Sequence, residues 1–199
     1  EAAPAARSTN PSFLAIDPRM RFLFAANETS QFEGKPTGSV SAYAIDPESK
    51  SLTLLNQQSS HGSSPCYVTV DRTGRWVLVA NYSSGNAAVY PVRDDGTLEP
   101  ASCVVQHEGS SVNPQRQKEP HTHSILLDPG NRFAFAADLG IDKVMIYRFD
   151  SQAGKLEPAT QPWAQAKPGS GPRHFAFHPN GKLAFLIQEI SSTMTSFAY

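Results

Sequence analysis

The segment Pro11-Ser-Phe-Leu-Ala-Ile-Asp17-Pro18 has three further copies in this chain, all aligned with it without gaps. The copies are Pro65-Cys-Tyr-Val-Thr-Val-Asp71-Arg72, Thr122-His-Ser-Ile-Leu-Leu-Asp128-Pro129 and Pro172-Arg-His-Phe-Ala-Phe-His178-Pro179. The anchors at positions 17, 71, 128 and 178 are successively 54, 57 and 50 residues apart. A repeat of this length is typical of a propeller blade and is longer than most solenoid repeats.

Each copy is followed by the same series of features. A basic residue comes four positions after the anchor, and an apolar run follows it directly. A third segment ends in an aromatic residue, and a fourth follows a turn such as residues 94–100. The basic residues are Arg21, Arg75, Arg132 and Lys182, and the aromatic ones are Tyr43, Tyr90, Tyr147 and Phe197. Runs of β-branched and aromatic residues bounded by Gly, Asp, Asn and Pro predict four strands in each copy.

These repeats predict an all-β protein, a β-propeller of four-stranded antiparallel blades. We expect the innermost strands near residues 12–17, 66–71, 123–128 and 173–178, in blades near 11–57, 64–104, 121–162 and 171–199. The chain 1–199 is then a single propeller domain, and an incomplete one, because blade four stops before its fourth strand. A β-sandwich is the alternative, but the equal spacing of the anchors favours the propeller.

The composition limits the classes of partner. The chain has 17 basic and 18 acidic residues, and this balance predicts neither a nucleic acid nor a membrane as partner. No apolar run approaches the length of a membrane-spanning helix. Cys66 and Cys103 do not make a disulfide framework and fit a reducing compartment, so we expect a cytoplasmic protein. The Ala-rich, polar start of the chain leaves open a periplasmic protein whose signal has been removed.

The repeat also predicts where functional side chains converge. In a propeller the start of a blade's innermost strand and the end of its second strand lie at the same rim of the central channel. His123, Arg173 and Glu189 therefore meet at one rim, and an imidazole, a cation and a carboxylate together indicate a catalytic site. At the start of the first strand, the equivalent residues of the four copies are Ser12, Cys66, His123 and Arg173. At the end of the second strand they are Asn27, Asn81, Asp138 and Gln188. The position after that is occupied by Glu28, Tyr82, Leu139 and Glu189.

Each of these residues also has a structural alternative. His123 can be a packed or capping side chain, and Arg173 with Glu189 can be an ion pair that only satisfies itself. His107, His121 and His123 together raise the idea of a metal site. No Cys or carboxylate stands at ligand spacing beside them, so we expect no metal and no cofactor.

A long polar segment, residues 106–121, joins the second and third copies of the repeat. It must lie at the rim of His123, because the strand that carries His123 begins there. Loops of this length in compact domains are often functional, although a solvated loop without a role is the alternative. Arg116 and Lys118 are placed to reach an anionic substrate, and we include His121 and His174 among the substrate-binding residues.

Several segments carry a resemblance to a known family. They are Val79-Ala-Asn81-Tyr-Ser-Ser-Gly85, Asn113-Pro-Gln-Arg-Gln117, Pro120-His-Thr-His123-Ser124, Asp138-Leu-Gly-Ile-Asp-Lys-Val-Met-Ile-Tyr-Arg-Phe149 and Gly169-Ser-Gly-Pro-Arg173-His174-Phe-Ala-Phe-His178-Pro-Asn-Gly181. In these segments the chain resembles the lactonase family of seven-bladed β-propellers, which includes 6-phosphogluconolactonases and carboxymuconate cyclases. The resemblance implies a piece of about four blades, with His123, Arg173 and Glu189 as the active-site residues.

The resemblance also implies the reaction, hydrolysis of a small-molecule sugar lactone, above all 6-phosphogluconolactone to 6-phosphogluconate. His123 or Glu189 would take the proton of the attacking water, and Arg173 would stabilise the oxyanion or hold the phosphate. A carboxylate beside an arginine has a lowered pKa, which favours His123 as the base. The same residues suit a muconate-type lactone cycloisomerase, in which Arg173 holds a substrate carboxylate. A non-catalytic ligand-binding propeller is the third possibility.

Overall fold

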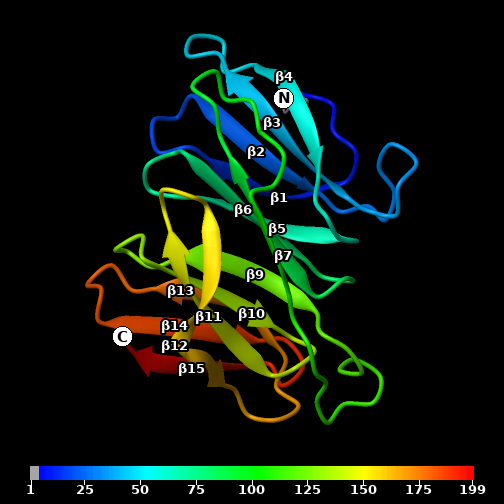
Figure 1. Cartoon of the computed structure of the whole chain (residues 1–199), viewed down its shortest axis with the longest axis vertical. Coiled ribbons are helices and arrows are strands. Elements are labelled where there is room, and N and C mark those ends of the chain that lie inside the picture. The colour runs from blue at the N-terminus through cyan, green and yellow to red at the C-terminus, as the bar shows by residue number, and fades with distance from the viewer. Residues whose placement is uncertain (1–4) are drawn as a thin grey trace.

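The computed structural model describes residues 5–199, and this part of the chain contains β-strands but no helix. The strands form four antiparallel sheets, and the order across each sheet follows the order along the chain (Figure 1). The sheets contain β1 Pro11–Ile16, β2 Phe22–Asn27, β3 Ser39–Ile45 and β4 Leu52–Ser59; β5 Pro65–Val70, β6 Trp76–Asn81, β7 Asn86–Pro91 and β8 Cys103–Gln106; β9 Thr122–Leu127, β10 Phe133–Asp138, β11 Lys143–Asp150 and β12 Lys155–Gln165; and β13 Pro172–Phe177, β14 Leu183–Gln188 and β15 Thr193–Ala198.

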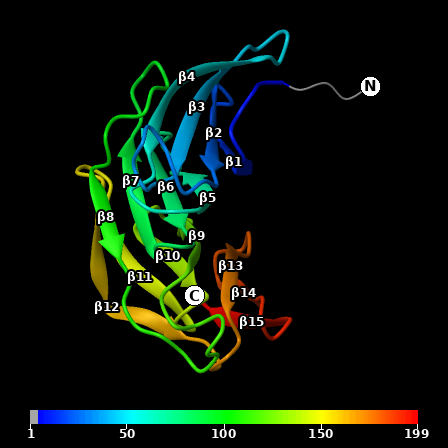
Figure 2. The same ribbon diagram turned by 90° about the vertical axis from the view of Figure 1, so that its right-hand side faces the viewer.

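The four sheets stand side by side around a curve. Figure 2 shows β1, β5, β9 and β13 on the inside of this curve and β4, β8 and β12 on the outside. Each inner strand contacts the inner strand of the next sheet. The prediction of a partial β-propeller of antiparallel blades is therefore confirmed, with three four-stranded blades followed by one of three strands.

The repeated Asp residues close the turn between the first two strands of a blade. Oδ1 of Asp71 accepts the backbone N–H groups four and five residues further along, at 2.8 and 2.9 Å. Asp17 and Asp128 make the same two contacts, and all three residues are buried. In blade four, Nδ1 of His178 accepts one N–H, two residues further along. A short carboxylate that satisfies two backbone N–H groups at once explains why the repeat places Asp here.

Every inner strand begins with a β-bulge. One residue of β1, β5, β9 and β13 has no partner in the register with the second strand, and it occupies the same position in each blade. The bulged residues are Ser12, Cys66, His123 and Arg173. A bulge bends the strand and re-aims the side chain of the unpaired residue. The backbone thus presents the first sequence column identically in all four blades.

Apolar clusters fill the spaces between consecutive sheets. Phe24 and Val77 belong to the first cluster, Leu78 and Ala136 to the second, and Phe135 to the third. The strand β6 contributes to both the first and the second cluster, and all of its residues are buried. Each inner sheet is therefore held by both neighbours, and burial of apolar area on two faces stabilises the row.

The outer strands extend further than the sequence predicts. The strand β4 ends at Ser59, β8 at Gln106 and β12 at Gln165, two or three residues beyond the predicted ends of their blades. The last residues of these strands are polar, as is usual at the edge of a sheet. Because polar residues are also typical of loops, the sequence does not show where these strands end.

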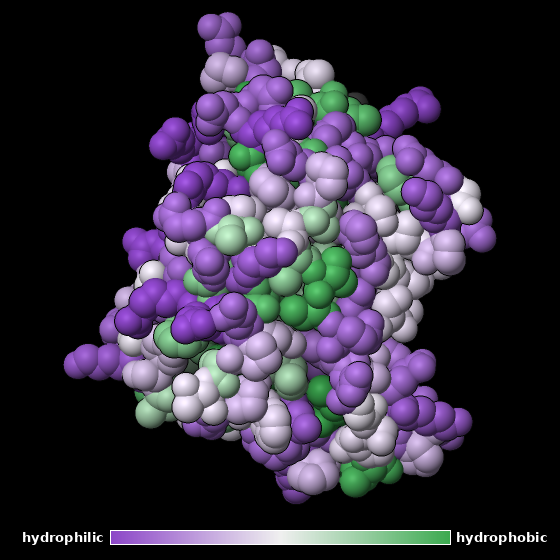
Figure 3. Space-filling model, viewed as in Figure 1, coloured by the Kyte–Doolittle hydropathy of each residue, from purple (hydrophilic) through white to green (hydrophobic). Residues whose placement is uncertain are grey.

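The surface of the molecule is mainly polar on the face shown in Figure 3. Hydrophilic side chains cover most of the face in Figure 3, with a small group of apolar ones near its middle. Within residues 5–199, we find no helix of the length and apolarity needed to cross a membrane.

Candidate active site

A polar pocket of about 290 Å³ opens at the inner rim of the curved row of sheets. All four bulged residues reach it, together with residues that follow the second strands of three blades. The lining residues are Ser12, Phe13, Glu28, Cys66, Tyr82, Arg116, His123, Arg173, His174 and Glu189. The column that begins with Ser12 and the column that begins with Glu28 thus converge on one cavity. Leu139 of the second column is the exception, because it is fully buried.

His123, Arg173 and Glu189 form the centre of this pocket. Nε–H of Arg173 donates to Nε2 of His123 at 3.1 Å, and the same Nε lies 2.9 Å from Oε2 of Glu189. Oε2 of Glu189 is 3.7 Å from Nε2 of His123. The structure therefore brings together the three side chains that the sequence columns place at one rim.

Arg116 is the fourth member of this group. Its Nη2 donates to Oε1 of Glu189 at 2.6 Å and to the hydroxyl of Tyr82 at 3.1 Å. Glu189 therefore lies between two arginines, one on each of its oxygens. Charge-assisted contacts of this kind fix the orientation of the groups that make them, so the carboxylate sets the positions of both guanidinium groups.

The electrostatics of His123 favour the neutral ring. Burial lowers the pKa of His123 to about 4, and the positive charge of Arg173 lowers it too. The ring is therefore uncharged at neutral pH, and its short distance to Glu189 is not an ion pair under these conditions. Its Nδ1 lies 3.8 Å from Sγ of Cys66, and burial raises the pKa of that thiol to about 12.

Glu189 stays ionised in the same surroundings. Its burial alone would raise the pKa of the carboxyl group. The hydrogen bond from Arg116 and the charges of Arg116 and Arg173 outweigh burial and hold the pKa of Glu189 below its usual value. His123 and Glu189 are thus both unprotonated at neutral pH, and a lowered pKa does not by itself separate them as bases.

The predicted substrate-binding residues fall in different places. His174 lines the pocket, and its ring lies edge-on to His123 with 5.3 Å between centroids. His121 stacks on Tyr82, with 4.6 Å between ring centroids, outside the lining of the pocket. Lys118 is exposed and is not part of the lining. The structure thus brings Arg116 and His174 to the site, and it leaves Lys118 and His121 outside it.

Four lining residues, Ser12 among them, stand in the columns but were not singled out by sequence. Glu28 and Tyr82 occupy the position of Glu189 in the first and second blades, and Cys66 occupies that of His123. Phe13 gave a weaker signal, because a regular strand turns successive side chains to opposite faces. The bulge breaks this alternation, so the residue after it also reaches the channel.

A buried polar network joins Thr122, the residue before His123, to His107 and Asp138. Nδ1 of His107 is 2.6 Å from Oδ2 of Asp138, and both side chains are inaccessible to solvent. Oγ1 of Thr122 lies 3.0 Å from each of these two atoms. The network attaches the start of the loop 107–121 to the end of β10, next to the strand that carries His123.

The idea of a metal site finds no support in the arrangement of these histidines. Within residues 5–199, the structure contains no cluster of three or more His, Cys, Asp or Glu side chains able to hold a metal ion. His121 stacks on Tyr82, and His107 pairs with Asp138 away from the pocket.

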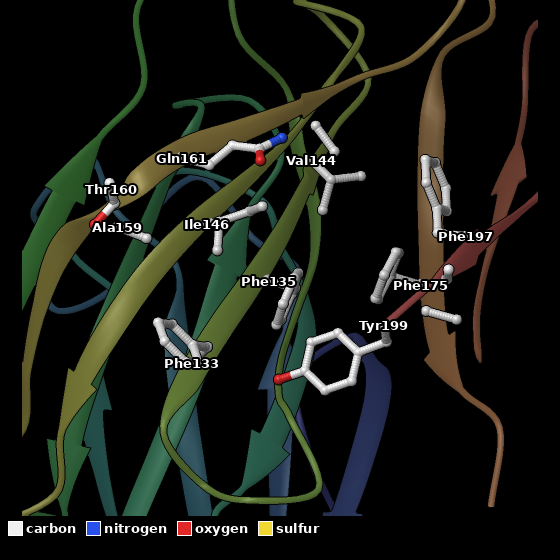
Figure 4. A pocket seen from close by; sticks show the side chains of 13 residues that line it. Phe133, Phe135, Val144, Ile146, Ala159, Thr160, Gln161, Phe175, Phe197 and Tyr199 are labelled. Carbon is white, nitrogen blue, oxygen red and sulfur yellow. The ribbon is translucent and has the colours of Figure 1, made fainter. Parts of the chain in front are cut away.

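A larger cavity, of about 430 Å³, lies between the third and fourth sheets. Figure 4 shows it between β11 and β12 on one side and β13 and β15 on the other, with Phe133, Phe135, Phe175 and Tyr199 around it. Its walls are largely apolar and carry no carboxylate, imidazole or basic group. The smaller pocket around Arg173 is therefore the candidate active site.

Fold and site together define a β-propeller with a polar pocket at the inner rim of its sheets, lined by two arginines, an ionised carboxylate and a neutral histidine. The comparison with protein families is specific: residues 1–199 match the family described as "Lactonase, 7-bladed beta-propeller". The chain belongs to this lactonase family.

Individual relatives agree with this assignment. The chain is 38% identical over 196 residues to a 6-phosphogluconolactonase of Bacillus subtilis, covering 98% of this chain and 53% of that protein. It is 30% identical over 191 residues to a 6-phosphogluconolactonase of Formosa agariphila, covering 95% and 53%. The structure of the periplasmic gluconolactonase of Pseudomonas aeruginosa superposes with a TM-score of 0.92 at 38% identity, covering 100% of this chain and 56% of that one. The chain thus spans about half the length of the relatives that it matches.

Proposed function

We propose that this pocket hydrolyses a sugar lactone, and that 6-phosphogluconolactone, which yields 6-phosphogluconate, is the principal substrate. The observation that carries the proposal is the contact between Arg173 and the unprotonated Nε2 of a neutral His123 at the wall of an open polar pocket. The names of the relatives support the choice of a lactone, and a small-molecule substrate suits a cavity of this size.

Arg173 is the group that stabilises the oxyanion. When water attacks the carbonyl carbon of the lactone, the carbonyl oxygen becomes negatively charged. The Nε of Arg173 is occupied by His123 and Glu189, whereas its terminal nitrogens make no hydrogen bond or ion pair with residues 5–199. These N–H groups are available to the oxyanion, and a positioned donor of this kind supplies a large part of catalysis in acyl transfer.

His123 is the base that takes the proton of the attacking water. The water oxygen forms a bond to the carbonyl carbon while its proton moves to Nε2 of His123. The bond between the carbonyl carbon and the ring oxygen then breaks, and the proton passes to the departing oxygen. Before this step, the hydrogen bond from Arg173 to Nε2 of His123 must break. The negatively polarised oxygens of the substrate can replace Nε2 as acceptors for Arg173.

Glu189 and Arg116 complete the assignment. Glu189 orients both guanidinium groups through its two oxygens. The Arg116 side chain is 45% exposed at the edge of the pocket, where it binds the anionic part of the substrate. His174, on the other side of His123, contacts the sugar ring.

The rest of the proposal concerns the whole protein. Four blades here, set against a family described as seven-bladed, support a single domain in which further blades complete the ring. The free thiols of Cys66 and Cys103 favour the cytoplasm, and the likeness to a periplasmic enzyme keeps the periplasm as the alternative.

The test is turnover by the full-length protein of three substrates: 6-phosphogluconolactone, the unphosphorylated gluconolactone and a muconolactone. Because lactones hydrolyse without a catalyst, each rate is compared with that of the Arg173→Ala variant under the same buffer conditions. Hydrolysis of a sugar lactone well above this background supports the proposal. Isomerisation of muconolactone alone would assign a cycloisomerase, and binding without turnover would assign a ligand-binding propeller.

A further inference from the structure

One buried carboxylate outside the pocket, Asp142, contacts two segments that carry arginines of the site. It lies in the turn between β10 and β11 and is fully buried. Its Oδ2 accepts hydrogen bonds from the hydroxyl of Ser111 at 2.5 Å and from N–H of Gly169 at 2.7 Å. Its Oδ1 accepts N–H of Gly171 at 2.8 Å and the hydroxyl of Ser170 at 3.4 Å.

The two segments lead directly to the arginines. Ser111 belongs to the loop 107–121, which carries Arg116. The residues 169–171 form the turn before β13, whose second residue is Arg173. A single carboxylate thus connects the backbone supports of the two guanidinium groups, and these groups hold Glu189 from opposite oxygens.

The remainder of the loop is fixed to the same β10–β11 turn. Nε2 of Gln117, which is buried, donates to the carbonyl of Leu139 at 2.8 Å. N–H of His121 donates to Oδ1 of Asp138 at 2.8 Å, and His107 contacts the other oxygen of Asp138. The turn 138–142 is therefore the common support of the loop, and among the hydrogen bonds within residues 5–199 those of Asp142 join this turn to residues 169–171, just before Arg173.

The backbone conformation of Asp142 determines which substitution can remove its side chain cleanly. Its φ is +53°, in the left-handed region that favours glycine. Blade two has Gly85 at the same position of the repeat, with φ +59°, and blade four has Ser192, with φ +54°. The position therefore accepts glycine, so replacing Asp142 by glycine removes the side chain without straining the backbone.

We infer that Asp142 is a positioning residue that sets the separation of Arg116 and Arg173 around Glu189. It touches no substrate and acts through the two segments that it holds. The kinetic part of this inference rests on the proposed lactonase function, whereas the structural part does not.

The experiment compares full-length wild-type protein with Asp142→Gly, Asp142→Asn and Ser192→Gly. Asp142→Gly removes the four contacts and leaves a residue suited to the backbone conformation. Ser192→Gly is the matched control, since it makes the same change at the same position of the repeat, and no hydrogen bond of the Ser192 side chain is found within residues 5–199. Asp142→Asn retains the shape of the side chain and one acceptor oxygen, and it keeps the test decisive if the glycine variant does not fold.

Amide hydrogen exchange is the first measurement. We expect exchange of Gly169 and Gly171 and of the loop 107–121 to accelerate at least tenfold in Asp142→Gly, less in Asp142→Asn and not in Ser192→Gly. Wild-type exchange of these segments in Asp142→Gly would overturn the inference. This measurement needs no activity, so it separates a failure of the inference from a failure of the proposed function.

A double-mutant cycle is the second measurement. We expect Asp142→Gly to lower kcat/KM for the lactone by about a hundredfold in the wild-type background, because small displacements of catalytic groups cost factors of this size. In the Arg173→Ala background the further loss should be less than tenfold, since the residue acts through that arginine. Equal losses in both backgrounds would show a general effect on the fold and would overturn the inference.

Discussion

The Nε–H group of Arg173 donates to Nε2 of His123 across 3.1 Å. This contact defines the tautomer of His123, because a nitrogen that accepts a hydrogen bond carries no proton. The proton then resides on Nδ1, on the side of Cys66. The lone pair that would accept a proton from water therefore faces Arg173, the residue that we propose as the oxyanion donor.

Arg173→Ala should lower kcat/KM for the lactone by about a hundredfold or more, because it removes the proposed oxyanion donor. The measurement is steady-state hydrolysis by the full-length protein, corrected for the uncatalysed reaction. Arg148→Ala is the control, since this exposed arginine pairs with Glu157 on the outer part of the third blade. Equal activity of the two variants would remove Arg173 from the mechanism.

Titration of His123 by NMR should give a pKa near 4 in the wild-type protein. The folded pKa lies below the unfolded value of about 6.5, so the unfolded state binds more protons between these values. The free energy of unfolding should therefore fall as the pH is lowered from 6.5 towards 4, by up to about 3 kcal/mol from this residue. Urea unfolding of His123→Gln at both pH values should show a smaller decrease, and an identical decrease would contradict the assignment.

Glu189→Gln should reduce activity less than Arg173→Ala does, because the amide keeps one acceptor for an arginine but loses the charge that holds both. His123→Ala should reduce activity by a factor comparable to that of Arg173→Ala if His123 is the base. The three variants are compared in kcat and KM after their folding has been checked by circular dichroism. If Glu189→Gln is the most damaging of the three, Glu189 is the base.

Arg116→Ala should raise KM for a phosphorylated lactone by about tenfold and leave kcat less affected, as expected for a residue that binds the charged end of the substrate. Lys118→Ala is the matched control, because it removes a cation from the same loop that does not line the pocket. Its KM should stay within about twofold of the wild-type value. An increase for Lys118→Ala alone would assign the anion contact to that residue instead.

Asp71→Ala should lower the free energy of unfolding by about 2–4 kcal/mol, because it leaves the buried N–H of Trp76 and the part-buried N–H of Arg75 without their acceptor. His178→Ala, at the same position of the repeat in blade four, should cost under about 1 kcal/mol, since His178 accepts one N–H and is more exposed. Chemical denaturation of both variants measures the difference. Equal losses would show that the Asp turn contributes no special stability.

The repeat made most of the fold predictable. The Asp anchors and apolar runs mark the inner strands to within one residue, since each anchor makes short-range contacts that the sequence displays directly. The ends of the outer strands were less visible, because polar edge residues do not alternate with apolar ones. The position of β12 up to Gln165, for example, depends on pairing with β11 and not on its own composition.

The site was predictable where it followed the repeat and less so elsewhere. His123, Arg173 and Glu189 occupy repeated columns, so a shared backbone position is enough to bring them together. Arg116 belongs to a loop without a counterpart in the other blades, and its contact with Glu189 depends on buried anchors such as Asp142. The preference for His123 over Glu189 as base rested on the lowered pKa of a carboxylate, and burial lowers the pKa of His123 as well.

The bulge at the start of each inner strand makes the residue that faces the pocket independent of the pairing that holds the sheet together. Its apex residue takes no part in the pairing of the strands, so Ser12, Cys66, His123 and Arg173 can differ completely while the sheets around them stay alike. For protein engineering this makes the rim a set of independently exchangeable positions. A new nucleophile or metal ligand introduced at Ser12 or Cys66 would face the same cavity as His123 and Arg173, with no redesign of the blades that support it.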